Sequence, residues 1–180
     1  MLFRSQLTYT VPGGWALATD EAGFFGLQPA VSELVGIYVF RGAQAMSQDR
    51  SCPDAAEAGV DATAAGLTAW IRGLKALKVG TPRLATIGGL PGTELDLEIA
   101  AGWTQSCSFA NGQPTVALLL GEQAAYHWVM YGTEKMRLTI LDGPGGKPIL
   151  VAVDATEGAL FDDLAVNAAP IVKTFAFKTS

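Results

Sequence analysis

Short segments of alternating apolar and polar residues, separated by turns rich in glycine and proline, dominate this sequence. Residues 93–99 show the pattern most strictly, with leucine or isoleucine at positions 95, 97 and 99 and a carboxylate at positions 94, 96 and 98. A period of two is typical of a strand with one buried face. Because the strand patterns follow one another through short turns, they predict an antiparallel sheet and not alternating βαβ units.

Further strands are expected where β-branched and aromatic residues lie between turn residues. They are predicted at residues 3–11, 15–18, 24–28, 35–40, 82–87, 115–120, 125–131, 135–141, 148–153 and 174–177. Two long segments without a period, 41–60 and 102–114, are expected to be loops.

Two amphipathic helices are expected beside the sheet. Asp61 is the expected cap of the first helix. Its apolar stripe follows helical spacing and consists of Leu67, Trp70, Ile71, Leu74 and Leu77.

The second helix is expected after residue 153. Asp154 and Glu157 have the spacing of a capping box, in which each side chain accepts from the other residue's backbone N–H. Pro170 is expected to kink or end this helix. Its apolar face consists of Leu160, Phe161, Leu164, Ala168 and Ile171.

Length and composition indicate one folded domain over residues 1–180. Apolar residues make up 49% of the chain and charged residues 16%, which predicts a large core and argues against disorder. The net charge of −5 and the scattered basic residues argue against nucleic acid and anionic membranes as partners. No apolar run reaches the roughly 18 residues of a membrane span.

The two cysteines lie in polar, loop-like surroundings. Cys52 falls in the first long loop and Cys107 in the second, and no metal-binding pattern accompanies them. We therefore predict a Cys52–Cys107 disulfide, which would place the domain outside the reducing cytosol. The start of the chain lacks signal-peptide features and fits either a cytoplasmic protein or a segment of a longer protein.

His127, the single histidine, is the main candidate for chemistry. One interpretation is a sheet histidine with one nitrogen partnered. The other is a polar contact in a ligand cleft lined by Tyr126, Trp128 or Tyr131. A serine-hydrolase arrangement lacks its Gly-x-Ser-x-Gly elbow.

Carboxylates gather at two places. Glu94, Asp96 and Glu98 share one strand face, too widely spaced for one calcium ion, and Lys135 and Arg137 have matching parity to pair with them. Four acidic residues crowd the first loop, and we interpret them as solvated or capping groups and not as a cation site: Asp49, Asp54, Glu57 and Asp61. The glycine-rich residues 142–147 lack the ending of a phosphate-binding loop and are expected to form a hairpin turn. We expect no metal and no cofactor.

Aromatic residues suggest where a partner would bind. Trp103 lies in the second loop near Cys107, where it serves either recognition or packing under the loop. The expected binding surface comprises Arg50, Trp103, His127 and Trp128.

Three short motifs occur in one order along the chain: Val11-Pro12-Gly13-Gly14-Trp15, the turn 88–92 (Gly-Gly-Leu-Pro-Gly), and a C-terminal helix running into residues 171–177. This order resembles the PsbP-like domains, named after an extrinsic protein of photosystem II. The resemblance implies an α/β/α sandwich around an antiparallel sheet, often secreted or lipid-anchored in bacteria, without shared catalytic residues.

These observations predict an α+β domain with a central antiparallel sheet flanked by helices. The predicted function is non-enzymatic binding of a protein or small molecule in an extracytoplasmic setting. The alternatives are a small hydrolase that uses His127 and a nearby carboxylate, and a structural assembly subunit.

Overall fold

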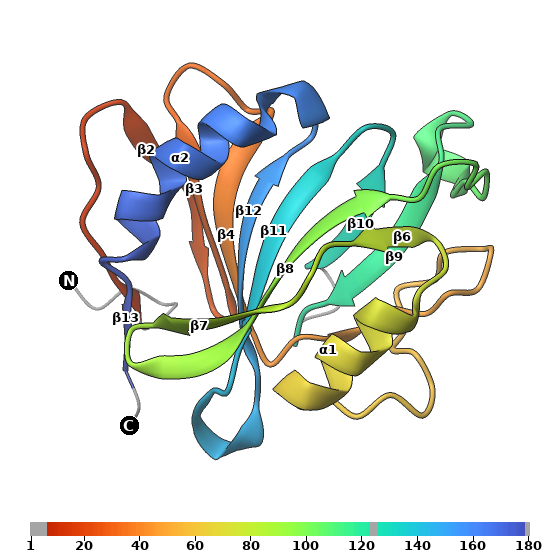
Figure 1. Cartoon of the computed structure of the whole chain (residues 1–180), viewed down its shortest axis with the longest axis horizontal. Helices are drawn as coiled ribbons and strands as arrows, with labels where there is room; N and C mark the ends of the chain where they lie inside the picture. The colour runs from red at the N-terminus through yellow and green to blue at the C-terminus, as the bar shows by residue number, and fades with distance from the viewer. Residues whose placement is uncertain (1–6, 123–125, 179–180) are drawn as a thin grey trace.

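The computed structural model describes residues 7–122 and 126–178, which form antiparallel β-sheets with two α-helices (Figure 1). The predicted α+β class is therefore confirmed. Residues 3–6 and 125, which were expected to begin two of the strands, lie outside the described residues.

An eight-stranded sheet runs through the middle of the molecule, and each of its strand pairs is antiparallel. All seven residues of its strand β12 are buried, as expected for a strand covered on both faces. The strands lie in the order β2 (Trp15–Glu21), β3 (Phe24–Pro29), β4 (Val35–Arg41), β12 (Ile149–Ala155), β11 (Lys135–Leu141), β8 (Leu90–Ile99) and β6 (Leu77–Val79), with β7 (Arg83–Ile87) also paired to β8.

One face of this sheet packs against helix α1 (Ala64–Gly73) and a three-stranded sheet. The small sheet has the order β10 (His127–Tyr131), β9 (Thr115–Leu120) and β5 (Gln44–Ala45). Leu67 of α1 and Leu118 of β9 lie in the same buried cluster as Leu138 of β11. Helix and small sheet thus share one hydrophobic core, at the right of Figure 1.

The other face packs against helix α2 (Phe161–Val172) and a two-stranded ribbon of β1 (Leu7–Thr8) and β13 (Ala176–Phe177). Leu164 and Ile171 of α2 are buried with Val151 and Val153 of β12. Successive residues of β12 therefore enter different cores, because side chains alternate across a strand.

The α/β/α sandwich that the resemblance implies is not confirmed. Helix α2 covers one face, but α1 shares the other face with the three-stranded sheet (Figure 1). Two of the predicted strands, as β9 and β10, belong to that small sheet, and in the described residues they pair with each other and with β5 rather than with the central strands.

Helix α1 differs from its prediction at both ends. Thr63, and not Asp61, is the cap, and its Oγ1 accepts from the backbone N–H of Gly66 at 3.1 Å. The helix ends at Gly73, so Leu74 caps it and Leu77 belongs to β6. The apolar spacing continues past the helix because the next strand also faces the core.

Helix α2 begins later than predicted. Asp154 pairs with Met136 on one side and Gly36 on the other, so the ladder keeps it in β12 and the predicted capping box does not form. Pro170 lies inside the last turn, and the helix continues to Val172. Because proline has no backbone N–H, the carbonyl of Val166 receives no helical hydrogen bond from Pro170.

The remaining strand predictions agree with the structure to within a few residues. Residues 135–141 are confirmed as β11, and the turn after 141 contains a 3₁₀ turn (Pro144–Gly146). The two-residue strand β5 and the three-residue strand β6 were not predicted, since segments this short show no alternation. Within the described residues, neither α-helix is long and apolar enough to span a membrane.

Gly92 allows β8 and β11 to approach closely. A Cβ at this position would lie 2.2 Å from the carbonyl oxygen of Ile140. We expect Gly92→Ala to lower the free energy of unfolding by about 1–3 kcal/mol, the range for overpacking. Denaturant unfolding measures this change. Gly73→Ala is the control, since nothing lies within 4 Å of a Cβ there, and an equal loss in both variants would contradict the packing argument.

Candidate binding surface

The Cys52–Cys107 disulfide joins the two long loops, and the prediction of this bridge is confirmed. The Cα atoms are 5.7 Å apart across a sequence separation of 55 residues. Cys107 is buried, whereas Cys52 is half-buried. The bridge therefore fixes the outer part of the first loop to the inner part of the second.

The first loop is also held by hydrogen bonds near its base. Gln48 donates from Nε2 to the carbonyl of Ala117 in β9 at 2.6 Å, and its backbone N–H donates to Glu57 Oε2 at 2.7 Å. A single bridge between Met46 and Ala56 closes the base. Residues 49–55 therefore project as a tip that carries Arg50, which is exposed.

Three of the four acidic residues in this region have a local partner. Asp49 accepts from the backbone N–H of Ser51 at 2.8 Å, Glu57 accepts from Gln48, and Asp54 contacts His127. Hydrogen bonds from the side chain and backbone of Ser51 lower the pKa of Asp49. Among residues 7–122 and 126–178, no group of three or more His, Cys, Asp or Glu side chains is placed to hold a metal ion.

Trp103 packs under the second loop. Of the two roles that the sequence suggested for it, recognition and packing, the structure shows packing. Its Nε1 donates to the carbonyl of Thr115 at 2.9 Å, and its ring contacts the core between α1 and the sheets. The buried Thr115 hydroxyl also accepts from the backbone N–H of Cys107 at 2.8 Å. Trp103 thus positions the loop and does not form its exposed surface.

His127 lies in strand β10 and links that strand to the tip of the first loop. Its Nδ1 is 2.9 Å from Asp54 Oδ1, and both side chains are at least one-third exposed, 35% and 54% respectively. This geometry matches a sheet histidine with one nitrogen partnered. In the described part of the chain, no hydroxyl or thiol is hydrogen bonded to His127, and both cysteines are in the disulfide.

Trp128 points inward, so it does not belong to the exposed binding surface that the sequence suggested. Its ring centroid lies 4.7 Å from that of Tyr38, and its Nε1 donates to Glu134 Oε1 at 2.8 Å. The neighbouring strand positions explain this orientation, since His127 and Trp128 must point to opposite sides of β10.

Phe109 is an exposed aromatic residue that the sequence analysis missed. It lies in the 3₁₀ turn Ser108–Ala110, two residues after Cys107, and 58% of its surface is accessible. Tyr131, at the end of β10, is 40% exposed. The sequence signal that could have identified Phe109 is its position as an apolar aromatic residue between a cysteine and an Asn-Gly turn, in an otherwise polar loop.

We name the exposed residues on and beside the bridged loops the clamped loop face. Three of them lie two positions from a bridged cysteine, and two lie in β10, which contacts the first loop through the His127–Asp54 pair. The clamped loop face consists of Arg50, Asp54, Phe109, His127 and Tyr131.

A second polar feature, absent from the sequence analysis, is a pair of buried carboxyl groups. Glu134 and Asp154 are 2% and 3% exposed and are hydrogen bonded to each other. Burial and the adjacent Glu134 charge raise the pKa of Asp154 well above its ordinary value. Burial also raises the pKa of Glu134. The sequence did not indicate this pair, because the spacing of Asp154 and Glu157 suggested a helix cap instead.

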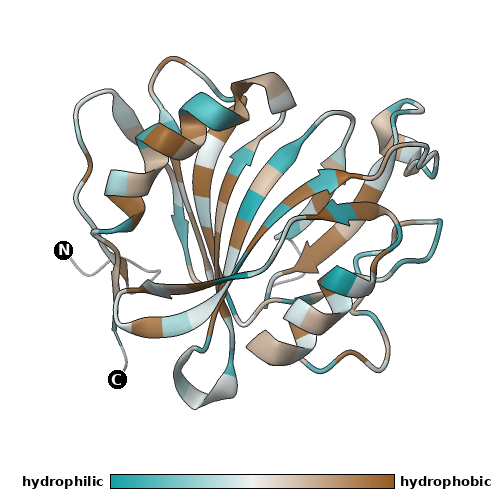
Figure 2. Ribbon diagram, in the orientation of Figure 1, coloured by the Kyte–Doolittle hydropathy of each residue, from teal (hydrophilic) through white to brown (hydrophobic). Residues whose placement is uncertain are grey.

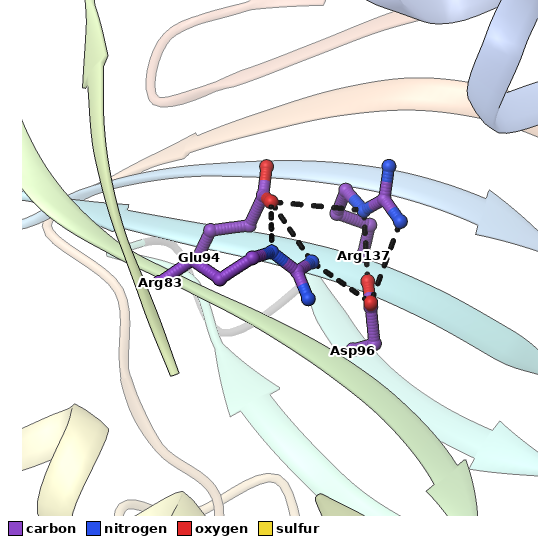
Figure 3. A network of polar contacts seen from close by, with 4 residues as sticks. All are labelled: Arg83, Glu94, Asp96 and Arg137. Atoms are coloured by element: carbon purple, nitrogen blue, oxygen red, sulfur yellow. Dashed lines mark hydrogen bonds and ion pairs between the residues drawn. The ribbon is translucent and has the colours of Figure 1, made fainter. Parts of the chain in front are cut away.

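The predicted carboxylate ladder forms an ion-pair network on the exposed part of the central sheet. Asp96 contacts Arg137 and Arg83 at 2.8 Å each, and Glu94 contacts Arg83 at 2.9 Å (Figure 3). The predicted partner Arg137 is confirmed, whereas Glu98 pairs with Lys78 and not with Lys135. Figure 2 shows the corresponding hydrophilic bands on β8 and β11.

This network is structural. Burial alone would raise the pKa of Asp96, but hydrogen bonds from Arg137 and Arg83 outweigh it and lower that pKa. Carboxylates that are neutralised by two guanidinium groups have little capacity left for a cation or for acid–base chemistry.

Breaking the disulfide should destabilise the domain. Closing a loop of 55 residues corresponds to about 4 kcal/mol in the chain-entropy model. We expect the variant with both Cys52→Ala and Cys107→Ala to unfold at a lower temperature by calorimetry, and reductant to shift the wild type in the same direction. Intact mass should show the native protein lighter than the reduced chain by two hydrogens. Free thiols in the native protein would contradict the bridge.

Replacing Arg137 with Met should weaken the fold most at neutral pH. Because the folded-state pKa of Asp96 is lowered, its ionised form stabilises the fold above the ordinary carboxyl range, and this stabilisation is lost as pH falls through the lowered value. We expect the free energy of unfolding to fall by about 1 kcal/mol at pH 7, which is typical of a well-formed surface pair. The difference between variant and wild type should become smaller at acid pH. Urea unfolding across pH measures it. Lys78→Met, which breaks a more exposed pair, should have a smaller effect, and a pH-independent loss in Arg137→Met would refute the electrostatic explanation.

Comparisons with known proteins return structures but no sequence family. No family model and no curated protein matches the chain. LpqN, involved in cell envelope biogenesis of Mycobacterium tuberculosis, matches 94% of this chain over 82% of its own, at 14% identity and a TM-score of 0.45. A Bacteroides thetaiotaomicron protein matches 97% of this chain at 10% identity and a TM-score of 0.40, and this chain spans 46% of its length. Cyanobacterial PsbP from Synechocystis matches 97% of this chain over 88% of its own, at 10% identity and a TM-score of 0.44. A PsbP structure is therefore among the structures that the comparison returned.

Proposed function

We propose that this chain is a single, non-enzymatic binding domain that contacts a protein partner through the clamped loop face. The observation that carries the proposal is the disulfide, which holds the exposed Arg50 and Phe109 on adjoining loops. Fixing these loops before binding lowers the conformational entropy that association would cost. Aromatic residues and arginines are among the residues enriched at protein interfaces.

The same disulfide supports an extracytoplasmic location, because disulfides persist in oxidising compartments and are rare in the cytosol. The acidic net charge of −5 argues for a protein or small-molecule partner over nucleic acid. A cytoplasmic location is the alternative, and free thiols in the natively expressed protein would favour it.

A site-specific crosslinker would test the proposal in the cells that natively express the chain. We expect a photo-reactive phenylalanine at position 109 to form an adduct with a second protein. The matched control is the same group at Leu84 in β7, which is 96% exposed and lies away from the clamped loop face (Figure 1). Position 84 should give no such adduct.

Each outcome of this experiment separates the hypotheses. Adducts of equal yield at both positions, or none at position 109, would contradict the proposed contact surface. Adducts between copies of this chain at position 109 would instead favour an assembly subunit.

The His127–Asp54 contact at 2.9 Å favours one second candidate, a hydrolase in which Asp54 orients His127 as a general base. In this case, His127→Ala would abolish turnover and leave the fold intact. A panel of ester and peptide substrates tests it, and wild-type protein without turnover on that panel would leave the candidate without support.

A further inference from the structure

The buried carboxyl pair lies where the three-stranded sheet meets the central sheet. Glu134 occupies the turn between β10 and β11, and Asp154 lies in β12, in register with Met136 of β11 and Gly36 of β4. The pairing that the structure gives for β10 is with β9, not with a strand of the central sheet. Side chains therefore hold β10 against the central sheet.

Glu134 supplies two of these side-chain contacts. Its Oε1 accepts from Trp128 Nε1 at 2.8 Å, and its Oε2 accepts from the backbone N–H of Tyr131 at 3.1 Å. Both donors belong to β10. Glu134 thus anchors the strand near its beginning and at its end.

The pattern of hydrogen bonds indicates which carboxyl group carries a proton. Both oxygens of Glu134 already accept N–H groups, so Glu134 is the ionised member and Asp154 donates to it. Asp154 Oδ1 is buried without a hydrogen-bond partner in the described structure. A neutral carboxyl group tolerates this position far better than a carboxylate would.

Among the described residues, no Lys, Arg or His side chain lowers the pKa of Glu134 or Asp154, so no cation there stabilises a second negative charge. From β4, the phenol of Tyr38 lies over Gly36, where a Cβ would be 2.6 Å from its hydroxyl, and this hydroxyl accepts from Gln28 of β3. Burial raises the pKa of Tyr38, so its phenol remains neutral. Lys135 follows Glu134 but packs beside Gly158 on the opposite face of the sheet. His127, also on β10, is directed to Asp54.

We propose that the proton on Asp154, shared with Glu134, acts as a pH-sensitive clasp that holds β10 against the central sheet. When this proton leaves, two adjacent buried carboxylates repel each other. Glu134 is then displaced from Trp128 and from the end of β10, and the aromatic contact between Trp128 and Tyr38 loosens. The clasp does not depend on the proposed binding function, because it is a property of the isolated domain.

The direction of the pH dependence follows from linkage. Above the ordinary carboxyl range, the folded chain retains one proton that the unfolded chain has lost, so stability falls as pH rises until the folded pair also releases it. One retained proton corresponds to a tenfold increase in the unfolding equilibrium constant for each pH unit in that window. The pair therefore favours, at low pH, the form in which β10 is held against the central sheet.

The variant Asp154→Asn tests the clasp, since the amide keeps a donor toward Glu134 and cannot ionise. We expect its unfolding constant, relative to that of the wild type, to fall by up to tenfold per pH unit above pH 5, by denaturant titration. Hydrogen exchange should show wild-type residues 127–131 losing protection relative to the variant as pH rises, with β4 unchanged. Asp142→Asn, at an exposed residue, is the control, and its unfolding constant should change with pH as that of the wild type does.

If the unfolding constants of the wild type and Asp154→Asn change with pH in parallel, the proposal is overturned. Equal loss of hydrogen-exchange protection in β10 and β4 would also overturn it. Carbon-13 NMR of the wild-type side-chain carboxyl groups provides a test that does not depend on any variant folding. One of the two groups should stay protonated above the ordinary carboxyl range. Titration of both groups within the ordinary carboxyl range would refute the shared proton.

Discussion

Burial of the central strands on both faces is the constraint on which the rest of the structure depends. Strand β12 has no exposed residue, and its alternate side chains enter two separate cores. A sheet of this kind needs a cover on each side, which α2 supplies on one face and α1 with the small sheet supplies on the other. The polar part of the sheet appears where that cover ends, at the network around Asp96 (Figure 3).

Covering one face with a second sheet has a consequence at its border. Strand β10 lies against the central sheet without joining it, so side chains replace the backbone ladder there. Aromatic rings and the Glu134–Asp154 pair fill this position, together with the disulfide that fastens the adjoining loops. The proposed binding surface and the proposed clasp therefore both lie along the margin of the three-stranded sheet, where fewer backbone hydrogen bonds hold the chain.

Patterns carried by neighbouring residues were predicted well, whereas most features that depend on distant partners were not. The Cys52–Cys107 bridge and the pairing of Arg137 with the carboxylates of β8 are the exceptions. Residues 135–141 match β11, and the exposure of residues 135–138 alternates as strand geometry predicts. Residues 138–141 are all buried, because both faces of the sheet are covered there. Asp154 was assigned to a helix cap because its local spacing fits one, but its partners Gly36 and Met136 are far away in sequence and keep it in a strand. The sequence likewise did not indicate which way the Trp128 side chain points, because that depends on its contact with Tyr38.

The sequence by itself determined the α+β class, the antiparallel sheet, most strand positions and the pairing of the two loop cysteines, since periodicity and cysteine environment are local properties. Only the tertiary structure decided that the strands divide between two sheets, that Phe109 is exposed while Trp103 and Trp128 are packed, and that two carboxyl groups share one buried site. These features arise from contacts between segments separated by many residues, where the environment of a side chain is set by packing and not by its neighbours in the chain.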